Sequence, residues 1–145
     1  MDIRSYHSSD SEAVIRLWGL CGLAVPQNNP EKDIERKLKV NPEWFLVGEE
    51  GGRIVSTCMV GYEGHRGWIN YLAVHPELQG SGLGAVMMRR AEDLMRQVGC
   101  SKINLQIRST HEAVIQFYKG VGYTQDPVVS MGKRLVSDVP DQDAD

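Results

Sequence analysis

The sequence lacks the features that mark membrane, secreted and fibrous proteins. No apolar run approaches the roughly 20 residues that a membrane-spanning helix needs. Residues 1–4 show neither the basic start nor the apolar stretch of a secretory signal. Hydrophobic residues make up 41% and charged residues 24% of the 145 positions, which is the balance of one globular domain. We therefore expect a cytoplasmic protein without a membrane partner.

Cysteine and excess positive charge are also scarce. Cys21, Cys58 and Cys100 are odd in number, widely spaced and free of any CxxC pair. This pattern favours a reducing compartment, argues against disulfides and a zinc site, and predicts three small buried thiols rather than a nucleophile. The net charge of −3 gives no broad basic surface, so no nucleic-acid partner is expected. His7, His75 and His111 have no carboxylate or cysteine partner at metal-ligand spacing, so no metal is expected.

Hydrophobic periodicity predicts an α/β (α+β) domain over residues 1–136, followed by an acidic tail, 137–145, with little to bury. The predicted order is β-α-α-β-β-β-α-β-α-β, and the three central strands form an antiparallel meander. The expected strands are 3–6, 44–49, 53–62, 68–74 and 102–107, with one or two more within 123–134; the expected helices are 10–21, 31–39, 82–98 and 111–120.

Three glycines, Gly80, Gly82 and Gly84, lie between a predicted strand and the longest predicted helix. Without a Cβ, glycine lets another group approach the backbone N–H closely. The start of the helix adds unpaired N–H groups and the positive end of its dipole, so the loop suits an anion such as a pyrophosphate. Taken alone, a short glycine pattern leaves a purely structural turn equally open.

Two other nucleotide-binding loops fit this segment less well. The third glycine of G-x-G-x-x-G is missing, and no Asp or Glu ends the following strand, where a ribose-binding acid would stand. A Walker A loop is also absent, because no Gly-Lys-Ser/Thr follows.

Residues 79–84, Gln-Gly-Ser-Gly-Leu-Gly, resemble the Q/R-x-x-G-x-G/A motif of the GNAT superfamily of N-acetyltransferases. The preceding strand, 71–76, and the late helix, 113–123, are similar to the corresponding segments of that family, in the same order. Residues 63–67 and 132–135 resemble the bacterial YpeA-type acetyltransferases. The resemblance implies a mixed, mostly antiparallel twisted sheet flanked by about four helices, with a splayed strand pair that holds the cofactor.

The same resemblance implies that acetyl-coenzyme A is the cosubstrate. In the family, loop N–H groups hold the pyrophosphate, and the splayed strand pairs with the pantetheine arm and polarises the thioester. A threonine occupies the place of the family's asparagine at the start of the late helix. The implied binding residues are Leu72, Ala73, Val74, Gln79, Gly80, Ser81, Gly82, Leu83, Gly84 and Thr110.

Tyr118 matches the family tyrosine that protonates the departing thiolate. A phenol has a pKa near ~10 and a thiol near ~8.5, so this transfer is feasible within a hydrogen bond. The alternative for a tyrosine on an apolar helix face is a core position. The family's glutamate base has no counterpart, so Glu63 and His65 are the candidates to accept the amine proton through water. Ordinary polar residues at a hairpin tip are the alternative.

The sequence thus predicts direct transfer of an acetyl group to an amine, with catalysis by positioning and by stabilisation of the oxyanion. A degenerate acetyl-coenzyme A-binding or sensor domain is one alternative, and a different nucleotide-binding protein is another. The acceptor stays open among a small amine, a peptide N-terminus and a lysine. A homodimer is also left open.

Overall fold

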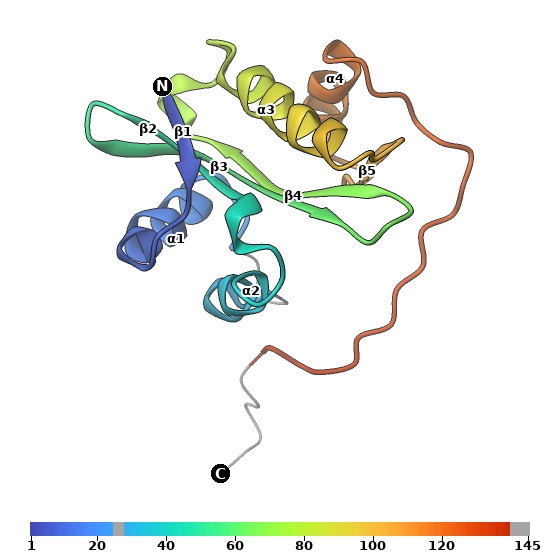
Figure 1. Cartoon of the computed structure of the whole chain (residues 1–145), viewed down its shortest axis with the longest axis horizontal. Helices are drawn as coiled ribbons and strands as arrows, with labels where there is room; N and C mark the ends of the chain where they lie inside the picture. Colours follow the sequence, from blue (N-terminus) through green and yellow to red (C-terminus); the bar gives the residue numbers. More distant parts are fainter. Residues whose placement is uncertain (25–27, 140–145) are drawn as a thin grey trace.

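The computed structural model describes residues 1–24 and 28–139. Five strands and four main helices form within these residues. Figure 1 shows them arranged as an open sheet with helices on both faces. None of the helices in this part of the chain combines the length and apolar character that a membrane crossing requires. The elements are β1 (Asp2–Ser5), α1 (Ser11–Leu20), α2 (Pro30–Lys37), β2 (Phe45–Glu50), β3 (Arg53–Tyr62), β4 (Gly67–Val74), α3 (Leu83–Gln97), β5 (Ile103–Leu105) and α4 (Glu112–Gly120).

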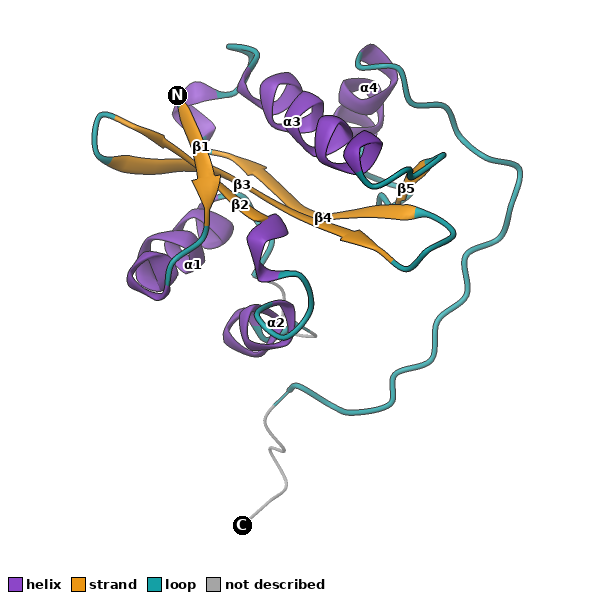
Figure 2. Cartoon of the chain, viewed as in Figure 1, coloured by secondary structure: helices purple, strands orange, loops and turns teal. Residues whose placement is uncertain are grey.

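The sheet has the order β1-β2-β3-β4-β5. Each of the first three strands is antiparallel to the next, whereas β4 and β5 are parallel because α3 connects them. Helices α1 and α2 cover one face and α3 and α4 cover the other, as Figure 2 shows. The predicted α/β class and mostly antiparallel sheet are therefore confirmed.

Each face of the sheet buries its own apolar cluster. Trp18 of α1 and Phe45 of β2 are the largest side chains of the first cluster, and both are fully buried. Met87 and Met95 of α3 join α4 in the second. Full burial of one such side chain stabilises the fold by about 1.5–3 kcal/mol, so these two faces fix the register of the sheet.

Local signals set the element ends close to their predicted positions. Asn29 caps α2 by accepting the amide of Lys32 at 3.2 Å, and Pro30 occupies the first helical position, where its missing N–H costs nothing. Gly51 and Gly52 turn β2 into β3 with positive φ angles of 59° and 77°. Such angles are accessible to glycine without steric penalty.

The prediction of one or two final strands within residues 123–134 is wrong. Between the end of α4 and residue 139 the structure has neither helix nor strand. The segment leaves α4, passes β5 and continues to α2 (Figure 1). A strand needs a backbone ladder, and this segment finds none in the described part of the chain.

The predicted tail begins at residue 137, and its first residues have defined contacts. The Asp138 side chain binds Arg36 of α2 and is almost fully buried. The rest of the predicted tail, residues 140–145, lies outside the described residues, as do positions 25–27 of the first loop.

Candidate functional site

Strands β4 and β5 separate halfway along β4. Their parallel pairing is confined to Gly67, Trp68 and Ile69 with Ile103, Asn104 and Leu105. Beyond this point β4 runs on for five residues, 70–74, while the other segment leaves the sheet. Among the described residues, no strand lies beside this edge of β4 beyond Ile69, so the N–H and C=O groups that point away from β3 have no strand partner there. The splayed pair expected from the resemblance is present.

A β-bulge lies within this open half of β4. Thr57 pairs with Ala73 and Met59 with Asn70, so two β4 residues, Tyr71 and Leu72, oppose the single residue Cys58. Tyr71 has a φ of 52°, a left-handed conformation that costs a bulky residue about 1–3 kcal/mol. A bulge twists the strand and redirects the groups beside it, so it changes the direction of the N–H groups at the open edge.

Two buried residues, Thr57 and Trp18, hold the Tyr71 backbone and ring in this conformation. The Thr57 hydroxyl donates to the Tyr71 carbonyl at 2.8 Å and accepts from the Trp18 indole at 2.9 Å. The rings of Trp18 and Tyr71 stack at 4.0 Å between centroids. Since Trp18 and Thr57 are fully buried, the bulge is fixed from the core on the α1 side of the sheet.

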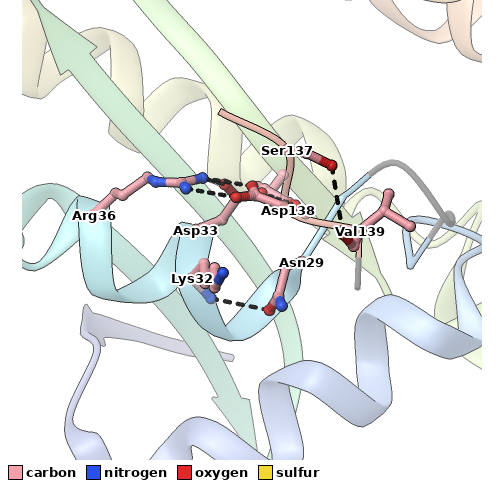
Figure 3. A network of polar contacts seen from close by, with 8 residues as sticks. Asn29, Lys32, Asp33, Arg36, Ser137, Asp138 and Val139 are labelled. Atoms are coloured by element: carbon pink, nitrogen blue, oxygen red, sulfur yellow. Dashed lines mark hydrogen bonds and ion pairs between the residues drawn. The ribbon is translucent and has the colours of Figure 1, made fainter. Parts of the chain in front are cut away.

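The ring of Tyr71 ends in a polar network on α2. Its hydroxyl donates to Asp33 at 2.5 Å, and Arg36 binds the same carboxylate at 3.3 Å. Figure 3 shows the Arg36 guanidinium turned toward Asp138, where two hydrogen bonds of 2.7 Å form a bidentate pair. The pair lowers the pKa of Asp138, whereas burial, followed by the Asp33 carboxylate, raises the pKa of Tyr71.

The glycine loop begins where the open edge ends. Gly80 and Gly82 have φ angles of 81° and 90°, so both positions require glycine. Gly82 is the N-cap of α3 and offers no side chain to its first turn. Among the described residues, no hydrogen bond reaches the amides of residues 82–85. These N–H groups lie at the positive end of a 15-residue helix, where the sequence predicted an anion site.

Side chains brace the loop against the end of β4. The Gln79 amide donates to the Val74 carbonyl at 3.1 Å, and the Ser81 hydroxyl donates to the Leu78 carbonyl. The Cys21 thiol also donates to the Val74 carbonyl, at 3.3 Å. The open edge of β4 and the glycine loop thus follow one another directly along the chain, from residue 70 to residue 85.

Helix α4, which carries Tyr118, packs against the first turn of α3. A Cβ at Gly84 would lie 2.9 Å from the Phe117 ring, so the glycine lets α3 and α4 approach closely. Tyr118, the next residue, is 8% exposed and packs edge-to-face against Phe117 and Tyr123. It shares its apolar cluster with Leu72 of the open edge.

The Tyr118 hydroxyl is an unused donor. It forms no hydrogen bond with the described residues. Every fully buried polar side-chain atom among those residues has a hydrogen-bond partner, so the Tyr118 oxygen is not fully buried and retains solvent access. Burial of the ring raises the pKa of Tyr118, which keeps the phenol protonated at neutral pH. The residue is therefore a core side chain whose protonated hydroxyl has no hydrogen-bond partner among the described residues, and its role as the acid stays a prediction.

The structure places Glu63 and His65 far from the glycine loop. Both lie in the hairpin before β4, about 23 Å along the strand from Val74. The Glu63 carboxylate accepts from the amides of His65 and Arg66 and from the Trp68 indole at 3.0 Å. These bonds lower the pKa of Glu63, so its carboxylate holds the hairpin together instead of standing free to take a proton.

The remaining candidates are also located. Thr110 is exposed in the turn before α4. Burial raises the pKa of the Cys58 thiol, beneath the bulge, to about 12, which makes it a poor nucleophile. Within residues 1–24 and 28–139, no cluster of three His, Cys, Asp or Glu side chains could hold a metal ion.

Sequence reasoning missed Thr57 and Asp33. Thr57 belongs to no motif, and Asp33 lies in a helix of mixed charge that carries no motif either. Their partner Tyr71 lies 14 and 38 positions away, respectively. No local pattern reports such a contact.

Comparisons with known proteins agree with this geometry. The model of the Acetyltransferase (GNAT) family matches residues 11–123. An acetyltransferase of Sodalis glossinidius is 46% identical over 139 residues, which cover 95% of this chain and 98% of that protein. The bacterial relatives are consistent with the YpeA-type subgroup expected from the sequence.

Solved structures share the fold at lower identity. The ribosomal-protein-S18-alanine N-acetyltransferase of Escherichia coli superposes with a TM-score of 0.72 at 20% identity, over 86% of this chain and 78% of that one. AAC(6')-Iy, solved with the bisubstrate analogue CoA-S-monomethyl-acetylneamine, gives 0.73 at 14% identity, over 92% and 97%. The chain therefore belongs to the GNAT family and is an acetyltransferase.

Proposed function

We propose that the protein transfers the acetyl group of acetyl-coenzyme A to an amine by direct attack in a ternary complex. The observation that carries this proposal is the open edge of β4 together with the amides of residues 82–85 at the start of α3, which have no hydrogen-bond partner among the described residues. A pyrophosphate suits the free amides of residues 82–85, and an extended pantetheine arm suits a strand edge. A protein of the same fold is solved with a coenzyme A conjugate.

Coenzyme A would lie along Leu72, Ala73 and Val74 and then along the loop residues 79–84, with Thr110 on the opposite side of the splay. The amine nitrogen forms a bond to the thioester carbon, and the C–S bond then breaks. A backbone N–H beside the bulge stabilises the oxyanion, a contribution of roughly 3–4 kcal/mol for one well-placed donor. Tyr118 donates its proton to the thiolate.

The attacking amine must first lose a proton, because a lysine-like amine has a pKa near ~10.4. The engaged carboxylate of Glu63 makes it a weak acceptor. His65 is exposed at the same hairpin and remains the predicted base candidate. A His65→Ala variant tests that role: its rate of acetyl transfer should fall well below that of the wild type if His65 takes the proton, and an unchanged rate would exclude His65.

Isothermal titration with acetyl-coenzyme A tests the cosubstrate site. The wild type should bind, and Gly82→Glu should lose at least about tenfold in affinity, because the new carboxylate repels the pyrophosphate. Gly51→Glu is the matched control, since Gly51 also has a positive φ and lies in an exposed hairpin away from the loop. A folded wild-type protein without affinity for acetyl-coenzyme A would contradict the proposal.

Turnover is tested separately, by release of free coenzyme A thiol in the presence of small amines, peptides with free N-termini and lysine peptides. Transfer to at least one acceptor class is expected. Binding without transfer to any of these acceptors would favour the sensor-domain alternative.

A further inference from the structure

The polar network at α2 already binds a carboxylate. The Arg36 guanidinium donates to both oxygens of Asp138 at 2.7 Å, and the Asp138 side chain is only 3% exposed. Two parallel hydrogen bonds of this kind match the planar fork of a guanidinium, which is the geometry by which arginine recognises carboxylates. In Figure 3 the Asp33 carboxylate meets the same guanidinium, at 3.3 Å. Two carboxylates therefore share one cation.

Positive charge also lines the space beside this pair. A hollow of about 590 Å³ lies next to Arg36 and is lined by residues 132–136, among them Lys133 and Arg134. Its volume falls within the roughly 300–1,000 Å³ of small-molecule sites. Within residues 1–24 and 28–139, no carboxylate forms a salt bridge with Lys133 or Arg134. The hollow therefore favours a ligand with negative charge.

Tyr71 connects this network to the open half of β4. Its backbone forms the bulge, beside which the proposed function places the thioester, and its hydroxyl donates to Asp33 at 2.5 Å. Asp33 and Arg36 are three residues apart on α2, so they are neighbours on one face of the helix, about 5–6 Å apart at Cβ. From the bulge outward, α2 therefore presents first a carboxylate and then a guanidinium.

We propose that the acceptor is an amine that also carries a carboxylate, and that this carboxylate binds Arg36 in place of Asp138. The inference rests on the proposed function, since it takes the acetylated nitrogen to lie beside the bulge. An amine near Asp33 and a carboxylate on Arg36 match the order of charges along α2. Asp138 then competes with the acceptor for one guanidinium. Such competition weakens the binding of acceptors with a carboxylate and leaves the binding of neutral acceptors unchanged.

Matched pairs of acceptors test this inference. The ω-amino acids with three to six carbons differ from their carboxamides only in the terminal charge, and transfer to each is followed by release of the coenzyme A thiol. For at least one chain length, kcat/KM of the wild type should be at least about tenfold higher for the acid than for the amide, because only the acid forms the bidentate contact. Arg36→Gln should bring this ratio close to one.

Two further variants separate recognition of the carboxylate from a structural role of Arg36. Asp138→Asn removes the competing charge, so the KM of the acid should fall at least about threefold while the KM of the amide stays the same. Arg16→Gln is the matched control and should keep the wild-type ratio, because Arg16 is an exposed arginine whose salt bridge, with Glu12, stays within α1. A disturbed fold would lower transfer to acid and amide alike, and circular dichroism checks the fold of each variant.

The NMR signal of the Arg36 Nε–H group reports the contact without turnover. Added 5-aminopentanoate should shift this signal, at lower concentration in Asp138→Asn than in the wild type, and 5-aminopentanamide should leave it in place.

Two results would overturn the inference. One is an acid-to-amide ratio near one at every chain length in an active wild type, and the other is an Arg36 signal that the acid does not shift. Neither result touches the proposed function, which fails instead if the wild type binds no acetyl-coenzyme A and acetylates no amine. In that case the NMR titration alone decides whether Arg36 binds a carboxylate.

Discussion

Thr57→Val probes the support of the bulge at Tyr71. Valine keeps the shape of threonine but has no hydroxyl, so the substitution removes the bond to the Trp18 indole and the bond to the Tyr71 carbonyl. Each buried group that loses its partner costs about 1–3 kcal/mol, so the two groups together cost about 2–6 kcal/mol. The buried methyl group that replaces the hydroxyl offsets part of this cost, so we expect the free energy of unfolding to fall by about 2–4 kcal/mol. That is a large share of the roughly 5–15 kcal/mol that stabilises a typical domain.

Urea denaturation measures this loss directly. With a slope of about 1–3 kcal/mol per M, the midpoint should fall by about 1–3 M at an unchanged slope. Acetyl transfer should fall as well, because the left-handed conformation of Tyr71 loses the bond that holds its carbonyl. Turnover is measured at urea-free conditions under which the variant is folded.

Thr57→Ser is the matched control, since it keeps the hydroxyl and removes only one methyl group. We expect it to lose about 1 kcal/mol of stability and to retain activity. The reasoning would be refuted by a valine variant within about 0.5 kcal/mol of the wild type. It would also be refuted by a serine variant as unstable as the valine variant.

Three further predictions concern the tyrosines and the contact between α3 and α4. Tyr118→Phe should lower kcat by at least about 100-fold, as expected for loss of a general acid. The free energy of unfolding should be nearly unchanged, because the hydroxyl has no partner among the described residues. An unaltered kcat would exclude the acid role. Gly84→Ala should lower the free energy of unfolding, measured by urea denaturation, by about 1 kcal/mol, because the new Cβ would press on the Phe117 ring. Gly19→Ala is the control: Gly19 has open space around it, so this variant should gain about 0.5–1 kcal/mol. Equal effects of the two substitutions would contradict the close contact between α3 and α4. The free energy of unfolding should fall as the pH rises above about 10, because burial raises the pKa of Tyr71 and Tyr118. Above that pH the unfolded chain releases phenolic protons that the folded chain keeps. A free energy of unfolding that stays constant in urea titrations from pH 8 to pH 11 would show that folding does not raise the pKa of these two phenols.

The glycine loop shows what local chemistry makes predictable. Gly80 and Gly82 adopt positive φ angles because no side chain stands in the way, and α3 begins at once with four free amides. Both facts follow from neighbouring residues, so the sequence alone indicates an anion site. The three-strand meander was predictable for the same reason, since short turns such as Gly51–Gly52 join strands that are adjacent in the chain.

The base candidates show where local reasoning stops. Glu63 and His65 were chosen because their hairpin precedes β4, and sequence distance suggested that they lie beside the site. The hairpin is at the paired end of β4, however, while the site is at its open end. A strand separates its two ends by about 3.3 Å per residue, so nearness along the chain becomes distance in space.

The residues themselves determined the loop, the helix that follows it, the order of elements and the apolar faces that form the two cores, because each depends on spacing within one segment. Only the tertiary structure decided the bulge at Tyr71, the network from Asp33 to Asp138 and the lack of a strand in the described residues after α4. Those features depend on which distant segments meet when the sheet closes, and hydrogen bonds across 14, 38 or 102 positions leave no periodic trace in a sequence. Residues 123–134 were predicted to supply a final strand, but a strand exists only where a second backbone pairs with it.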